Sequence, residues 1–440
     1  MSASAPPLPA MAGLRYGLLG LPLAFMALPL YVHLPHVYAS RYGVPLATLG
    51  LVLLLARLFD ALIDPLLGRL ADRLQAKSSR HVLGAGAGAA VLLLAGMALL
   101  FFPPWNPPGA PASLLAMLML TCTAYSLLAI SHQAWGSQLG DNDAQRAHIV
   151  AWREGAALVG VVLASVLPTW LGWGQWLAVF ALALVLGWLA WWRGPAPFAR
   201  HRPQAQDLLR PAGPPWWQDL QHPWAHAPFR RLMVVFVLSG MASAVPATLV
   251  LFFIQDRIGA PTLQALFLAV YFAAAAASMP LWMGAVARWG LARTWLAGML
   301  LSVLVFAGAS RLGTGDVLAY GWVCALSGLA LGTDLALPGA LLAGIIAERG
   351  DRGQREGAYF GWWNLAAKLT LALAAGLGLP LLQWLGYQPG STSADGLQAL
   401  SLAYAVLPCA LKLLAAAGLY LAFVRQTPSS RPTPPIARTP

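Results

Sequence analysis

Three charged residues interrupt an apolar stretch near the start of the chain. In ARLFDALIDPLLGRLADR, residues 56–73, Arg57 lies three residues before Asp60, and Asp64 lies four residues after it. On an α-helix these spacings place the three side chains on one face. A charge at the centre of a bilayer costs about 2.5 to 3.5 kcal/mol on insertion scales, so this face should line a cavity and pair with other charges.

The charge count of this face indicates a site for a mobile cation. Arg57 can neutralise one carboxylate, and we expect it to hold Asp60 ionised, which leaves the second available. Asp64 is one turn nearer the end of the helix and is the expected proton carrier. The alternative is an internally neutralised ion network that only fixes helix packing.

Further charged and polar residues fall within apolar stretches. Arg153, Asp334 and Lys368 are expected to line the same cavity and to contact a substrate, together with a polar patch in AISHQAWGSQLG that contains Ser131, His132 and Trp135. Lysine is rare in this chain, because only Lys77, Lys368 and Lys412 occur and arginine fills the other cationic positions. Lys368 is the stronger functional candidate of the two in spans, since a compact ammonium exchanges partners readily. Lys412 could instead reach the membrane surface.

The composition is that of a polytopic membrane protein. Of the 440 residues 59% are hydrophobic and 10% are charged, with a mean hydropathy of +0.66. The net charge of +12 is spread over the ends of apolar runs, which argues against a nucleic-acid partner. Cys122, Cys324 and Cys409 have no metal or disulfide spacing, and no HExxH or GxSxG motif occurs, so we expect neither a cofactor nor an enzyme.

Apolar runs of about 20 residues, the length that crosses a bilayer, recur along the whole chain. The expected transmembrane helices lie near residues 16–38, 45–71, 82–103, 112–139, 147–171, 174–193, 231–255, 262–287, 294–311, 317–347, 357–386 and 397–425. The predicted fold is therefore all-α, with about twelve transmembrane helices in two bundles of six.

A polar segment divides these spans evenly. Residues 194–230 are rich in Pro, Arg and His and separate a bundle at 1–193 from a second at 231–425, which a tail at 426–440 follows. The linker's Trp-rich patches are expected to form a short helix at the membrane surface. Because alternate connections are basic, the positive-inside rule places both termini and the linker in the cytoplasm of a plasma (inner) membrane protein.

The two halves resemble each other. Asp64-Pro65-Leu66-Leu67-Gly68 in the second span has a counterpart in Met279-Pro280-Leu281-Trp282-Met283-Gly284 in the eighth. Gln145-Arg146 after the fourth span is matched by Gln354-Arg355 after the tenth. These positions indicate two parallel six-helix repeats.

The sequence resembles the major facilitator superfamily, and within it the melibiose-carrier group of glycoside-pentoside-hexuronide:cation symporters. Residues 56–73 resemble that group's second-helix signature, AISHQAWGSQLGDNDAQRAHIVAWREG its fourth and fifth helices, and LPGALLAGIIAERGDRGQREGAYFGWWNLAAK its tenth and eleventh. The resemblance implies that Asp60 and Asp64 coordinate Na⁺, Li⁺ or H⁺ and that Arg153 binds sugar. Asn364, in the last stretch, joins the substrate candidates.

The same resemblance implies a cytoplasmic gate after the second span. The portion from Gly68 to Asp72 and Arg73 fits the superfamily's gate motif, and Arg80 is expected to join it. Glycine permits close helix approach, and the aspartate can accept hydrogen bonds from the N-terminus of a neighbouring helix.

Departures from the group's pattern bear on the coupling ion and the substrate. Ile63 stands where an Asn often adds a sodium ligand, Ser131 or His132 stands where the fourth helix has an Asp, and the first span has no acidic residue. Fewer oxygen ligands favour H⁺ over Na⁺.

The expected function is symport of a small organic solute by a monomer, with a coupling cation and membrane lipids as its other partners. A lysolipid-like amphiphile, carried or scrambled, and a non-transporting sensor are the alternatives.

Overall fold

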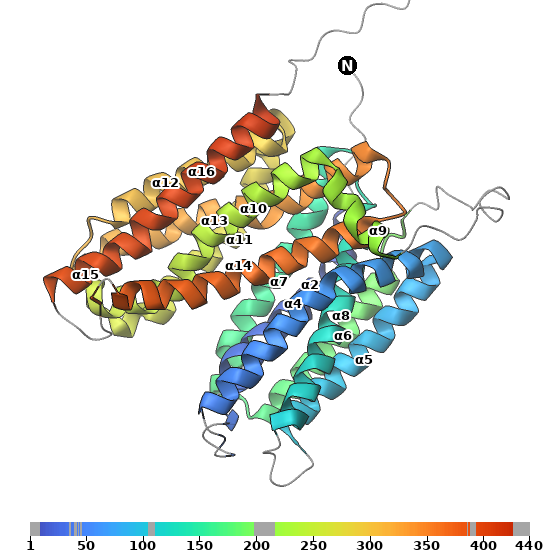
Figure 1. Ribbon diagram of the computed structural model, residues 1–440, viewed down its shortest axis with the longest axis horizontal. Helices are drawn as coiled ribbons and strands as arrows, with labels where there is room; N and C mark the ends of the chain where they lie inside the picture. The colour runs from blue at the N-terminus through green and yellow to red at the C-terminus, as the bar shows by residue number, and fades with distance from the viewer. Residues whose placement is uncertain are drawn as a thin grey trace, which may run out of the picture.

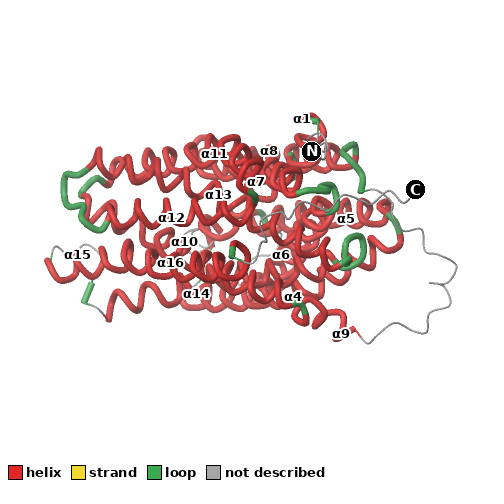
Figure 2. Tube along the Cα trace, turned by 90° about the horizontal axis from the view of Figure 1, so that it is seen from above, coloured by secondary structure: helices red, strands yellow, loops and turns green. Residues whose placement is uncertain are grey.

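The computed structural model describes residues 9–34, 37–38, 42, 44, 46–103, 111–197, 216–384, 386–387 and 393–425. These residues form helices and connecting loops, with no β-strand among them (Figure 2). Residues 198–215 of the predicted linker and the predicted tail at 426–440 lie outside the described residues.

The N-terminal half contains the first six predicted spans. Its elements are α1 (Ala10–Gly17), α2 (Gly20–Leu28), the π-helical turn η1 (Pro29–His33), α4 (Leu46–Lys77), α5 (Ser79–Phe101), α6 (Pro111–Ser137), α7 (Asp143–Trp170) and α8 (Trp173–Trp192).

The C-terminal half contains the other six. Its elements are α10 (Ala227–Phe252), the π-helical η4 (Phe253–Ile258), the 3₁₀ turn η5 (Pro261–Leu263), α11 (Gln264–Trp289), α12 (Leu291–Ala309), α13 (Val317–Arg349), α14 (Glu356–Trp384), α15 (Ala394–Ser401), η6 (Leu402–Val406), α16 (Leu407–Leu419) and η7 (Tyr420–Val424).

Each of the predicted spans coincides with helix in the described residues. Nine described segments are long and apolar enough to cross a membrane. The linker carries two short elements, α9 (Trp216–Gln221) and η3 (His222–Ala225). Helix α10 begins at Ala227, four residues inside the predicted linker, because Pro228 fits a first helical turn.

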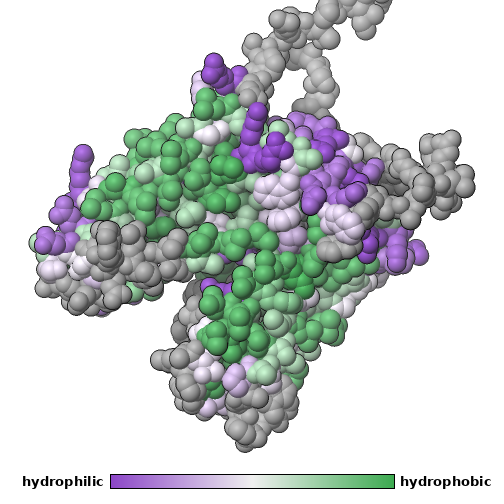
Figure 3. Space-filling model, viewed as in Figure 1, coloured by the Kyte–Doolittle hydropathy of each residue, from purple (hydrophilic) through white to green (hydrophobic). Residues whose placement is uncertain are grey.

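The two halves are separate bundles that meet at one end. They converge beside α9 and diverge away from it, so that the molecule has a V shape (Figure 1). The space-filling view shows a notch between the halves at the other end, and apolar residues cover the flanks of both (Figure 3). Leu54, Leu304 and Leu318 are among the exposed apolar side chains, as a lipid-facing surface requires.

The contacts between the halves repeat in a crossed manner. Helix α4, the second span of its half, packs against α14, the fifth span of the other; α11 and α7 form the reciprocal pair. Pro65 lies inside α4 and Pro280 inside α11. The sequence repeat therefore corresponds to helices in equivalent positions, and the α4–α14 contact positions the candidate site.

Candidate ion and substrate site

A lysine from the C-terminal half reaches the two aspartates of the N-terminal half. The Nζ atom of Lys368 on α14 lies 2.7 Å from Asp60 Oδ1 and 2.8 Å from Asp64 Oδ2 on α4. It also donates to the hydroxyl of Ser126 on α6, at 2.7 Å. The Ser126 hydroxyl in turn donates to Asp60 Oδ1 at 2.9 Å. All three ammonium donors therefore have oxygen acceptors, and four side chains form one cluster.

Burial makes this cluster sensitive to charge. Asp60 is 2% exposed and Asp64 is fully buried. Two buried carboxylates within reach of one cation are stable together only while that cation is present. Arg57 is exposed, whereas the cation in contact with both carboxylates is Lys368. The pairing of Asp60 with Arg57, expected from sequence, thus omitted the cation that the fold supplies from 308 residues away.

Glycines let α4 and α14 approach closely beside this cluster. A Cβ atom on Gly68 would lie 2.0 Å from the carbonyl oxygen of Gly357, and one on Gly361 would lie 2.6 Å from the carbonyl oxygen of Asp64. Neither position tolerates a side chain in this conformation. The backbones of the two halves are therefore in direct contact between Asp64 and the start of α14.

Asp72 caps α14 across the junction. Its Oδ1 accepts a hydrogen bond from the backbone N–H of Gly357 at 2.6 Å, and its Oδ2 accepts one from that of Ala358 at 2.8 Å. A carboxylate at a helix N-terminus satisfies unpaired N–H groups and the helix dipole. Arg73 and Arg80 are exposed, and neither has a hydrogen-bond or ion-pair partner among the described residues. The structure thus brings Gly68 and Asp72 together at the junction but leaves the two arginines outside it.

We predict that Asp72→Ala opens the junction at the α9 end. The loss of two charge-assisted hydrogen bonds should cost about 2 kcal/mol, which shifts the equilibrium between closed and open forms roughly thirtyfold. The measurement is the labelling rate of Ser137→Cys, which lies between the halves, in a background without Cys122, Cys324 and Cys409. Asp316→Ala is the control, because Asp316 accepts a backbone hydrogen bond from Gly313 within its own loop. An unchanged labelling rate in Asp72→Ala would refute the gate.

Loops add ion pairs to the same end. Arg352 donates to Asp141 Oδ1 at 2.8 Å across the junction. In the linker, Asp219 on α9 lies 3.1 Å from Arg69 of the N-terminal half and 3.8 Å from Arg355 of the C-terminal half. The linker helix therefore bridges both halves, which the predicted role at the membrane surface did not include.

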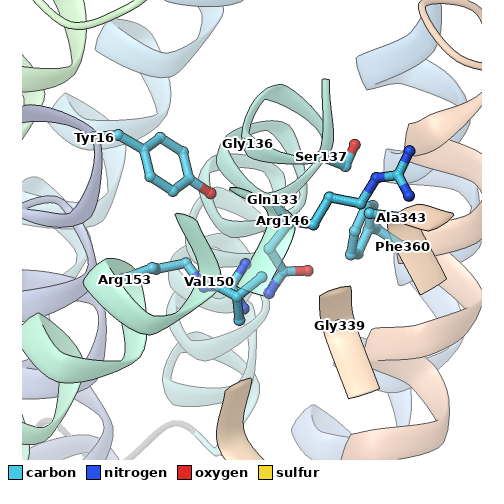
Figure 4. A pocket seen from close by; sticks show the side chains of 10 residues that line it. All are labelled: Tyr16, Gln133, Gly136, Ser137, Arg146, Val150, Arg153, Gly339, Ala343 and Phe360. Carbon is cyan, nitrogen blue, oxygen red and sulfur yellow. The ribbon is translucent and has the colours of Figure 1, made fainter. Parts of the chain in front are cut away.

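Arg153 lies between the halves in a small pocket. Its guanidinium and the Tyr16 hydroxyl point into a space lined by residues of both halves, including Gly339 and Phe360 (Figure 4). The space measures about 10 Å³, enough for about one water molecule. The path between the halves is therefore closed at this level, and Arg153 lies at its closed end.

Three of the predicted substrate residues lie in the core of the N-terminal half. His132 is fully buried, stacks on Tyr16 and has its Nε2 2.8 Å from the Tyr16 carbonyl oxygen. Trp135 is 1% exposed and donates to the carbonyl oxygen of Pro195. Ser131 is also buried. These side chains pack the bundle in this conformation instead of lining a cavity, which corrects their expected placement.

Asp334 belongs to a second ion pair inside the C-terminal half. Lys412 on α16 donates to Asp334 and, at 2.9 Å, to Ser239 on α10. Trp295 on α12 donates to Asp334 Oδ1 at 2.8 Å. Lys412 is thus buried and does not reach the membrane surface, and Asp334 lies apart from Arg153 in a separate polar cluster.

Asn364 also contributes to the closed junction. Its Nδ2 donates to Gln133 Oε1 of the N-terminal half at 2.7 Å. Sequence reasoning missed this partner and, more importantly, Ser126, which is the α6 side chain that reaches the aspartates. Ser126 lies five residues before Ser131. The feature of the sequence that could have identified it is a hydroxyl group within an apolar span.

A family model described as MFS/sugar transport protein matches residues 11–424. The chain belongs to this family. The transporter is thus a multi-pass membrane protein and not an enzyme, as predicted, and the resemblance to the melibiose-carrier group is confirmed. Among the described residues no group of three His, Cys, Asp or Glu side chains could hold a metal ion.

A curated relative matches part of the transporter. This relative is a putative sulfoquinovose importer of Salmonella typhimurium, and it is 29% identical to this chain over 142 residues. The match spans 31% of this chain and 29% of the relative's length.

Solved structures share the fold of the transporter over most of its length. A bacterial homologue of the iron transporter ferroportin, in an outward-facing state, has a TM-score of 0.66 and 16% identity, and the match covers 95% of this chain and 100% of that one. The fucose:proton symporter of E. coli has a TM-score of 0.62 and 12% identity, with coverages of 92% and 98%. A proton:xylose symporter has a TM-score of 0.62 and 15% identity, covering 94% of each chain. At these identities the likeness shows the major facilitator fold alone.

Proposed function

We propose that the protein is a cation-coupled sugar symporter that works by alternating access, with H⁺ as the coupling ion. The single observation that carries this proposal is the position of Lys368. Its ammonium contacts the oxygen atoms of Asp60, Asp64 and Ser126 that a coupling cation would need as ligands. Because the lysine belongs to one half and the oxygens to the other, cation binding and the contact between the halves exclude each other.

This exclusion supplies the thermodynamic link that coupling requires. A ligand shifts a conformational equilibrium only if it binds one state better than the other. A proton on Asp64 removes one of the two charges that hold Lys368, so it favours the form in which the α4–α14 contact is released. The closed form in turn expels the proton. Each half would move as a body around a midplane site.

The preference for H⁺ over Na⁺ follows from the sequence, because Ile63 and Ser131 or His132 stand where the group has an Asn and an Asp that would supply further ligands. The cluster offers two carboxylates, one hydroxyl and the Asp60 carbonyl oxygen, which already lies 3.3 Å from the ammonium. Sodium needs several of these oxygens at once, whereas a proton needs one. We place the closed, α9 end in the cytoplasm, in accordance with the basic connections at that end.

Uptake into proteoliposomes tests the proposal. The substrate panel contains hexoses, pentoses, glycosides, sulfoquinovose and lysophosphatidylcholine, each with an inward gradient of H⁺ or of Na⁺ alone. We expect accumulation of a sugar with the H⁺ gradient. Stimulation by Na⁺ at fixed pH would change the coupling ion, transport of only the lysolipid would change the substrate, and no uptake of any compound would refute the proposal.

A further inference from the structure

Arg153 has an acidic neighbour that adds a second functional group to the proposed substrate site. Its Nε and Nη2 atoms donate to Glu154 Oε1 at 3.0 and 2.6 Å. Both residues are on α7, and their side chains are 13% and 20% exposed. A partly buried ion pair inside an apolar span must face other polar groups or an aqueous space, since lipid offers it no hydrogen bonds.

The surroundings of this pair place it between the two halves. Arg153 Nη2 lies 4.0 Å from the position of a Cβ atom on Gly339 of α13, in the other half. Residues 151–157 of α7 are all half-buried. Arg153 therefore lies on the side of α7 that faces the other half, at the edge of the small pocket between the halves.

The pair combines fixed hydrogen-bond donors with a free acceptor. The Tyr16 hydroxyl lines the same pocket as the guanidinium and donates to the carbonyl oxygen of His132. Glu154 uses only Oε1 for Arg153, and Oε2 has no hydrogen-bond partner among the described residues. A sugar hydroxyl both donates and accepts, so adjacent hydroxyls match a free carboxylate oxygen beside guanidinium N–H groups.

We infer that Glu154 sets the charge preference of the transporter and selects neutral sugars over sugars that carry a carboxylate or sulfonate. Because Glu154 neutralises Arg153, an anionic group here meets a carboxylate and no unpaired cation, and like charges in contact are strongly unfavourable. This inference rests on the proposed function, since it names the substrate class of the same site.

The test compares matched neutral and anionic sugars in proteoliposomes. The pairs are glucose with glucuronate, galactose with galacturonate, and glucose with sulfoquinovose. The wild type should prefer the neutral member of each pair. Glu154→Gln frees Arg153, so the ratio of anionic to neutral uptake should rise about tenfold or more. Glu154→Asp keeps the charge and should retain the neutral preference.

Two further variants separate this role from a structural one. Glu348→Gln makes the same chemical change at an exposed position on α13 and should leave the ratio unaltered. The double variant Arg153→Gln with Glu154→Gln removes both charges, and the gain for anionic sugars should disappear. Thermal shifts with each sugar in detergent give the same ratios if uptake is too low to measure.

The outcomes distinguish this inference from the proposed function. A wild type that prefers the anionic member, or an unchanged ratio in Glu154→Gln, overturns the role of Glu154 while sugar transport stands. A wild type that neither binds nor transports any of the sugars overturns the proposed function and this inference with it.

Discussion

Lys368→Met is expected to abolish uptake driven by an ion gradient. The substitution leaves Asp60 and Asp64 buried without the ammonium that contacts both. Removal of one partner from a buried ion pair costs about 3 to 5 kcal/mol, so the closed form should be disfavoured by roughly 150-fold to 5,000-fold. Gradient-driven uptake in proteoliposomes measures the loss, and the Ser137→Cys labelling rate measures the opening of the junction.

The control for this prediction is another lysine. Lys77→Met removes the same group at the exposed end of α4 and should leave both measurements unchanged. A second variant, Lys368→Met with Asp60→Asn, lowers the charge that the missing lysine leaves behind and should restore part of the closed population. Normal uptake by Lys368→Met would show that the ammonium is not part of the coupling site.

Asp64→Asn is expected to separate transport from coupling. Asparagine is neutral like a protonated aspartate, so the variant should exchange labelled sugar between compartments of equal pH. It cannot release a proton, however, and a pH gradient should leave equal sugar concentrations inside and outside. Uphill uptake and equilibrium exchange, measured on the same vesicles, test both statements.

Neighbouring substitutions give this prediction its contrast. Asp60→Asn removes the carboxylate that joins Ser126 to Lys368, so it should impair binding or assembly as well as accumulation. Asp395→Asn, at the exposed start of α15, should behave as the wild type. If Asp64→Asn still accumulated sugar against its gradient, the proton would have another carrier.

Hydropathy and local motifs predicted much of this architecture. The bilayer dictates the length and polarity of each span, so the spans could be found without knowledge of tertiary contacts. The hydrogen bonds between Asp72 and the N-terminus of α14 could also be predicted, because the motif from Gly68 to Asp72 resembles the superfamily's gate motif.

The partners of individual side chains were harder to predict. Lys368 was conspicuous because lysine is rare in this chain, but its contact with Asp64 depends on how two halves pack over a separation of 304 residues. No local pattern contains that information. The sequence could therefore identify Lys368 as a candidate, but it could not predict its ion pair with Asp64.

The faces of α6 explain the misplaced residues. This helix is apolar on almost every side, so its periodicity does not indicate which side faces the cavity and which faces its own bundle. His132 and Trp135 were assigned to the cavity because they are polar or aromatic, yet they point into the bundle core. Ser126, in contrast, points to α4 and was overlooked.

Sugar and a proton should move together through the cluster of Asp60, Asp64 and Lys368. This coupled movement is measured by adding the transported sugar to proteoliposomes that contain a pH-sensitive dye, with no ion gradient imposed. The proposal predicts that sugar entry acidifies the interior of wild-type vesicles and that Asp64→Asn vesicles admit the sugar without acidification. Sugar entry into wild-type vesicles without any movement of H⁺ would contradict it.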